Sequence, residues 1–83
     1  MATVTIRYWA AAKEAAGVGE EICEANSLAE LMTKITRNRE TLATVVKRSS
    51  FLVDGDPVGR RAHEEVLLGD GVTVEVLPPF AGG

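Results

Sequence analysis

Near its N-terminus the chain reads Thr3-Val4-Thr5-Ile6-Arg7-Tyr8-Trp9, in which polar and apolar residues alternate as far as Tyr8. This period of two predicts a half-buried strand over residues 3–9, with Trp9 on the face opposite the core. Residues 72–77 alternate in the same way, and their three valines form the buried side. These two strands frame the elements whose order decides the fold.

The residues after the first strand predict a short helix and a second strand. Residues 10–16 are mostly alanine, a strong helix former, and Gly17 is typical of a helix stop. Residues 18–25 are expected to form a strand, although glutamates blur the alternation there. The two strands would then make a hairpin with a helical insert.

A capping box marks the start of the central helix. In Ser27-Leu28-Ala29-Glu30 the serine hydroxyl accepts from one free helix N–H group, and the glutamate reaches back to another. Apolar residues then recur at helical spacing and would place one stripe on the sheet: Leu28, Leu31, Met32 and Ile35. Asn38 is the predicted break, and a second short helix with the same spacing follows over residues 42–46.

Turn signals organise the second half of the chain. Residues 50–53 form an apolar strand that Asp54-Gly55 folds back toward Pro57-Val58, and Gly69-Asp70-Gly71 leads into the last strand. This order predicts an α+β fold, a mixed sheet of about five strands packed on one main helix. In this β-grasp arrangement the first and last strands lie side by side and parallel.

The composition of the 83 residues favours one small domain with a core of its own. Hydrophobic residues make up 46% and the formal net charge is −3, which disfavours nucleic acid and anionic membranes as partners. The longest apolar run, residues 8–12, is too short to cross a bilayer, and Met1-Ala2-Thr3 lacks the charge of a secretory signal. We therefore expect a cytoplasmic protein. With one cysteine, Cys23, and one histidine, His63, we expect no metal site; we interpret Cys23 as a small buried hydrophobe and His63 as a solvated loop residue.

The last six residues are the most informative for function: Pro78-Pro79-Phe80-Ala81-Gly82-Gly83. The prolines stop the strand and stiffen the exit, and the side chains after Phe80 shrink to nothing. Extended, six residues reach about 20 Å, so this tail can carry the α-carboxylate of Gly83 into a narrow tunnel of another protein. The alternative is a frayed terminus. We expect a domain over residues 1–77 and a flexible tail over residues 78–83.

Taken together, these residues resemble the family of molybdopterin synthase small subunits and thiamine-pathway sulfur carriers, which are ubiquitin-like β-grasp proteins that end in Gly-Gly. The resemblance covers nearly the whole chain and rests on five segments: Ile6–Ala10, Ser27-Leu28, Val53–Gly55, Gly69–Gly71 and Pro78–Gly83. The Pro78-Pro79 pair favours the molybdopterin branch, because thiamine carriers usually lack it. Phe80 departs from the pattern, since many relatives carry a smaller apolar residue there.

The resemblance implies a sulfur carrier rather than an enzyme in its own right. An activating enzyme similar to the ubiquitin-activating class would use ATP to adenylate Gly83, and sulfide from a sulfur donor protein would convert it to a thiocarboxylate. The large subunit of molybdopterin synthase, in a heterotetramer, would then take up the tail, and the sulfur would build the dithiolene of the molybdenum cofactor. The chain itself would bind no cofactor.

The outer faces of the first and last strands suggest a partner interface. Apart from Trp9 and Leu77, every residue on these faces is polar. If the strands are parallel neighbours, these two residues and Phe80 form an apolar patch at the base of the tail, typical of an interface anchor. The alternative is that Trp9 merely covers the short helix after it.

Other functions use the same tail. One is a sulfur carrier for thiamine or cysteine biosynthesis, and another is a ubiquitin-like modifier or binding module, whose Gly83 would end as an isopeptide on lysine or stay unmodified.

Overall fold

The computed structural model describes residues 2–79, which form a five-stranded sheet, three α-helices and a short 3₁₀ helix. The elements are, in order, β1 (Thr3–Tyr8), α1 (Ala10–Ala16), β2 (Glu20–Glu24), α2 (Leu28–Thr36), α3 (Glu40–Lys47), β3 (Ser50–Val53), β4 (Asp56–Pro57), η1 (His63–Glu65) and β5 (Thr73–Leu77). None of these helices is long and apolar enough to span a membrane.

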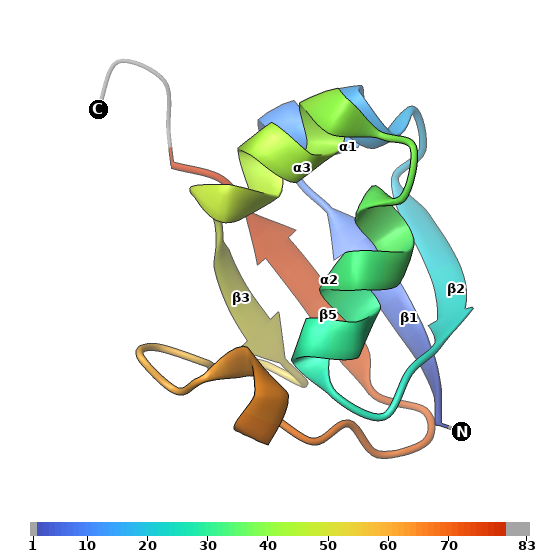
Figure 1. Ribbon diagram of the computed structural model, residues 1–83, viewed down its shortest axis with the longest axis vertical. Coiled ribbons are helices and arrows are strands. Elements are labelled where there is room, and N and C mark those ends of the chain that lie inside the picture. Colours follow the sequence, from blue (N-terminus) through green and yellow to red (C-terminus); the bar gives the residue numbers. More distant parts are fainter. Residues whose placement is uncertain (1, 80–83) are drawn as a thin grey trace.

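The sheet has the strand order β2-β1-β5-β3-β4. Its two central strands, β1 and β5, run parallel, with Ile6 opposite Val74 and Tyr8 opposite Val76. The neighbours on either side, β2 and β3, pair with them antiparallel. Figure 1 shows β1 and β5 side by side with α2 running across them. The predicted β-grasp arrangement, with parallel first and last strands, is confirmed.

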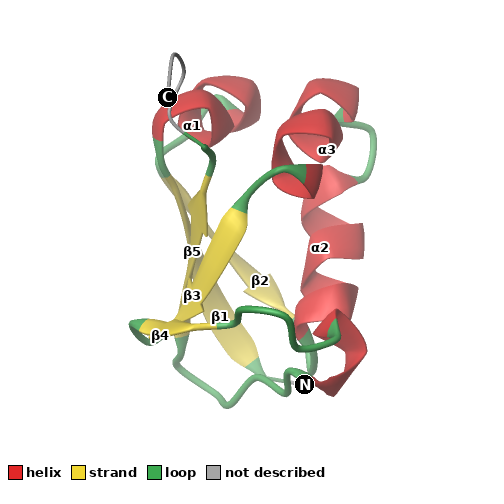
Figure 2. Cartoon of the chain, turned by 90° about the vertical axis from the view of Figure 1, so that its left-hand side faces the viewer, coloured by secondary structure: helices red, strands yellow, loops and turns green. Residues whose placement is uncertain are grey.

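The core lies between this sheet and the helical layer formed by α2 and α3 (Figure 2). The largest fully buried side chains come from both layers: Val4, Ile6, Leu28, Leu31, Leu42, Val74 and Val76. Burial of such side chains supplies most of the free energy of folding. The predicted helix stripe is confirmed at Leu28, Leu31 and Ile35, whereas Met32 is half-buried at its margin.

Local signals explain how the helices begin and end. Ser27 Oγ accepts a hydrogen bond from the Glu30 N–H group at 3.1 Å, as the capping box predicts. The Glu30 carboxylate instead accepts from the N–H group of Asn26, one residue before the cap, at 2.6 Å. Gly17 ends α1 in the left-handed conformation, and α2 ends at Thr36, just before Asn38 with φ of 59°.

Several predicted strand boundaries are wrong by one or two residues. The first strand ends at Tyr8, because Trp9 becomes the residue that precedes α1. The second is confined to Glu20–Glu24, since residues 17–19 make the turn out of α1. Val72 lies outside β5, because its N–H group closes a turn by donating to Gly69 O at 3.3 Å.

Two turn aspartates tie the ends of the central strands together. Asp54 adopts φ of 49° in a tight turn, and its N–H group and side-chain oxygen both bond to the backbone of Thr73 at 2.8 Å. The Asp70 side chain accepts from the N–H group of Thr3, also at 2.8 Å. These residues therefore hold the start of β5 and of β1, consistent with the predicted turn role.

Candidate functional site

The tail leaves the domain from the end of β5, the central strand. Leu77 is the last residue of the sheet, and Pro78 has no N–H group with which to extend the pairing. Pro78 is half-buried and Pro79 is exposed. The two prolines line a surface groove together with Ala11 of α1 and Val45 of α3. The start of the tail thus lies beside α1 and α3.

Four predicted tail residues lie outside the described part of the chain: Phe80, Ala81, Gly82 and Gly83. Their roles as the reacting terminus and its approach therefore stay predictions.

The structure places the backbones of Trp9 and Leu77 next to each other. Tyr8 is opposite Val76, and the Trp9 N–H group donates to Val76 O at 3.3 Å. Trp9 is itself extended, with φ of −118° and ψ of 150°, so the parallel register carries on to Leu77. Trp9 is 46% exposed, whereas Leu77 is half-buried. The docking role of this pair, with Phe80, stays a prediction.

The surface around Trp9 is charged. Arg7, Lys13 and Glu20 line a groove beside the indole. Arg7 Nε lies 3.5 Å from a carboxylate oxygen of Glu20, but both side chains are more than half exposed. An ion pair of this kind contributes little to the free energy of folding. Arg7 and Lys13 are therefore available to a partner that covers Trp9.

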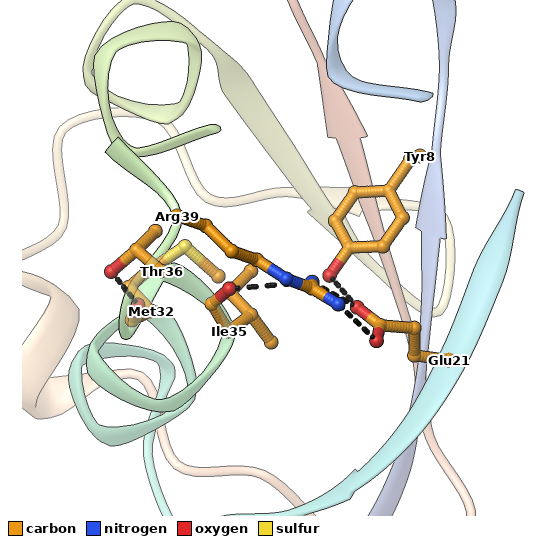
Figure 3. Close-up of polar contacts among 6 residues, drawn as sticks. All are labelled: Tyr8, Glu21, Met32, Ile35, Thr36 and Arg39. Atoms are coloured by element: carbon orange, nitrogen blue, oxygen red, sulfur yellow. Dashed lines mark hydrogen bonds and ion pairs between the residues drawn. The ribbon is translucent and has the colours of Figure 1, made fainter. Parts of the chain in front are cut away.

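Three polar side chains that the sequence analysis did not connect meet behind this surface (Figure 3). The Tyr8 hydroxyl donates to Glu21 Oε2 at 2.6 Å. Arg39, in the loop between α2 and α3, grips the same carboxylate with both terminal nitrogens at 2.7 and 2.9 Å. The three residues join β1, β2 and the start of α3. The cluster therefore ties the two strands to the helical layer.

Contacts within the cluster shift the pKa values of Tyr8 and Glu21. Hydrogen bonds from Arg39 lower the pKa of the Glu21 carboxyl, which therefore stays ionised at neutral pH. Burial, reinforced by the hydrogen bond to Glu21, raises the pKa of Tyr8 above its usual range. The tyrosine is thus a neutral donor to a charged acceptor, the stronger kind of hydrogen bond. A buried tyrosine needing a partner was the one signal of the cluster in the sequence.

We predict that Glu21→Gln lowers the free energy of unfolding by about 1–3 kcal/mol at neutral pH, since it leaves Arg39 and Tyr8 without their charged partner. The folded-state pKa of Glu21 is lowered, so its stabilisation is complete above the unfolded-state pKa and disappears as the pH falls through the folded-state value. Urea unfolding of the unsubstituted protein and of Glu21→Gln should therefore show a difference in the free energy of unfolding at neutral pH that disappears at acidic pH. The exposed Glu20→Gln should change stability by less than about 0.5 kcal/mol. A difference of equal size at both pH values would contradict the stabilising role of the ionised Glu21 carboxylate.

His63 and Cys23 do not extend the site. The expectation that His63 is solvated is wrong: η1 turns its ring edge-on to Phe51, with ring centroids 5.2 Å apart, and leaves it half-buried. Cys23 is half-buried on the core side of β2, in keeping with a structural role. Within residues 2–79, no group of three or more metal-ligating side chains comes together.

Comparisons with known proteins agree on the family. Residues 6–83 match the ThiS family. The molybdopterin synthase sulfur carrier subunit of Chlamydomonas reinhardtii is 30% identical over 83 residues, covering 96% of this chain and 98% of that protein.

Solved structures share the fold. The small archaeal modifier protein 1 of Methanosarcina acetivorans superposes with a TM-score of 0.86 at 24% identity, over 100% of this chain and 98% of its own. A chain from the complex of subunits 1 and 2 of the Helicobacter pylori molybdopterin-converting factor superposes with a TM-score of 0.71 at 25% identity. The match covers 98% of this chain and 99% of the Helicobacter pylori chain. With the family match spanning nearly the whole sequence, the chain belongs to the ThiS family.

Proposed function

We propose that this chain is the sulfur-carrier small subunit of a molybdopterin synthase and carries sulfur as a thiocarboxylate on Gly83. The observation that supports this most is the match to the Chlamydomonas reinhardtii sulfur carrier subunit, which runs over almost the full length of both proteins. The Gly82-Gly83 ending and the preceding Pro78-Pro79 pair supply the chemistry and the exit that such a carrier needs.

The proposed reaction begins with an unreactive group. A carboxylate is a poor electrophile, so an activating enzyme first lets the Gly83 carboxylate attack the α-phosphate of ATP, and pyrophosphate leaves. Sulfide provided by a donor protein then attacks the acyl carbon, and AMP leaves with the electrons of the C–O bond. The product is a thiocarboxylate. ATP belongs to the activating enzyme, and this chain is the substrate.

The domain contributes position rather than catalysis. The strand that ends at Leu77 is central to the sheet and rigidly paired on both sides, so the tail starts from a fixed point. The glycines remove side chains that would clash inside a tunnel. In this proposal the large subunit supplies the catalytic groups, and the sulfur attacks a cyclic pyranopterin monophosphate. The complex of two subunits in Helicobacter pylori supports a partner of this kind, and we propose a heterotetramer.

The runner-up functions use the same terminus differently. A carrier for thiamine or cysteine biosynthesis would make the same thiocarboxylate and deliver it to another acceptor. A ubiquitin-like modifier would join Gly83 to lysines. The archaeal modifier protein has the same fold as this chain at 24% identity. A likeness at that identity concerns the fold and does not favour the modifier function.

Mass spectrometry of the protein from its native host tests the proposal. Replacement of one oxygen by sulfur in the intact chain is the expected result, whereas attachment to lysines of other proteins would favour the modifier. The thiocarboxylated protein should then form a dithiolene product when mixed with a large subunit and the cyclic pyranopterin monophosphate. Sulfur transfer only in a thiazole-forming or cysteine-forming assay would favour the other carriers.

A further inference from the structure

One edge of the sheet is open along β2. Among residues 2–79, β2 pairs with β1 and with no other strand. The backbones of Gly19 and Ala25, on either side of the strand, bond to the β1 side. Since bonding alternates along an antiparallel strand, the N–H and C=O groups of Glu20, Ile22 and Glu24 point away from the sheet. This row of groups is a template for another strand.

At the Glu24 end of that row, a side chain already occupies the backbone oxygen. Lys34 Nζ, from α2, donates to the backbone oxygen of Glu24 at 2.6 Å. In the described part of the chain, the outward backbone groups of Glu20 and Ile22 have no comparable partner. The open stretch is therefore centred on Ile22.

Ile22 is also an exposed apolar residue on the outer face of the sheet. Its side chain is 74% exposed, although its neighbours on that face are Glu20 and Glu24. A second copy of this chain is a poor occupant, because antiparallel pairing of two β2 strands about Ile22 would set Glu20 opposite Glu24. Like charges facing each other across strands are destabilising. A different protein therefore fits this edge better than self-association.

The inner side of the same edge is positively charged. A groove of about 310 Å³ lies between β2 and the end of α2, and Lys34, Arg37 and Arg39 line it. The charge of Arg39 is neutralised by Glu21, as Figure 3 shows. Arg37 has no ion pair within residues 2–79, and Lys34 bonds to a neutral carbonyl. Two uncompensated cations thus face whatever enters the groove.

We propose that β2 is a docking edge for an extended segment of a partner protein in which apolar and acidic residues alternate. The segment adds to the sheet beside Ile22 through main-chain hydrogen bonds. Its apolar side chains cover Ile22 on the outer face, and its acidic side chains point into the groove toward Arg37 and Lys34. Because side chains of a strand alternate between faces, one sequence pattern satisfies both sides. The inference does not rest on the proposed sulfur transfer, since the tail takes no part.

The probe is the synthetic peptide acetyl-Thr-Val-Glu-Val-Glu-Val-Thr-amide, titrated into the ¹⁵N-labelled full chain. We expect saturable shifts and slowed hydrogen exchange at the amides of Glu20 and Ile22. The same peptide with lysine in place of glutamate should bind at least 10-fold more weakly, and Arg37→Glu should weaken binding of the acidic peptide by at least 10-fold. Equal binding of the two peptides, or shifts centred elsewhere, would overturn the proposal.

Variants of Ile22 separate strand addition from simple side-chain contact. Ile22→Pro removes the outward N–H group without removing a bond to β1, and should abolish peptide binding. Ile22→Thr keeps that group and should weaken binding several-fold, while Leu67→Thr, at an equally exposed leucine, should have no effect. If Ile22→Pro fails to fold by circular dichroism, the Ile22→Thr and Arg37→Glu results decide. Self-association of the free chain mapped to β2 would mean that a second copy is the occupant, and would also overturn the proposal.

Discussion

Deletion of Gly83 is expected to abolish thiocarboxylate formation completely and to leave the domain folded. In the proposed reaction the activated atom is the carboxyl carbon of Gly83, and no other residue can present it at the same place. The sheet ends at Leu77, and the buried core takes its last residue from Val76. The free energy of unfolding should therefore change by less than about 0.5 kcal/mol.

The measurement combines the purified chain with its activating enzyme, ATP and a sulfide source, followed by intact mass and a urea unfolding curve. An added alanine after Gly83 is the matched variant, because it keeps every native residue but converts the Gly83 carboxyl into an amide. It should be equally inactive. A truncated chain that is still thiocarboxylated and still supports cofactor synthesis would refute the carrier function.

The elements that could be predicted from sequence are those encoded by neighbouring residues. The Ser27 cap, the Gly17 stop and the Asp54-Gly55 turn each depend on a few residues close in the chain. The alternation in β1 and β5 identified their buried faces for the same reason. The parallel pairing of these two strands followed from the order of the elements, because few topologies accommodate that order.

The features that could not be predicted depend on residues far apart in sequence. Tyr8 and Glu21 are 13 residues apart and Glu21 and Arg39 are 18 apart, and no local pattern selects one glutamate among the several near β2. His63 is drawn onto Phe51 by the path of a loop with no regular period. The limits of β2 are hard to predict because it is an edge strand, whose alternation is weakened by inward-facing Glu21 and outward-facing Ile22.

The candidate site also has a part that neighbouring residues encode and a part that depends on residues far apart in sequence. The ending Gly82-Gly83 and the prolines before it are visible in the sequence alone. The surface groove lined by Pro78 is not visible there, because its other walls include Ala11 and Val45, from two helices that meet only in the folded chain. The sequence therefore predicts what the tail carries, and the structure adds which helices lie beside its start.

Substitution of Trp9 by glutamate should weaken binding to the large subunit by about 2 kcal/mol or more, roughly 30-fold in Kd. The register places Trp9 beside Leu77 at the point where the tail departs, so a partner that takes up the tail would also cover the indole. Trp9 is 46% exposed and contributes no side-chain cap to α1. A glutamate at this helix N-terminus is electrostatically tolerated, and the monomer should lose less than about 1 kcal/mol.

Affinity and thermal unfolding measured on the same preparation separate the possible roles of Trp9. The matched control is Leu67→Glu, which also places a charge on an exposed apolar side chain but lies in the loop that bridges to Ser27, away from Trp9. Weakened binding with an unchanged melting temperature, and full affinity in the control, would support the docking role. A large drop in the melting temperature would mean that Trp9 belongs to the core. Unchanged affinity in a stable variant would mean that the tail is guided by another surface, and the groove at Pro78 would then be the next place to test.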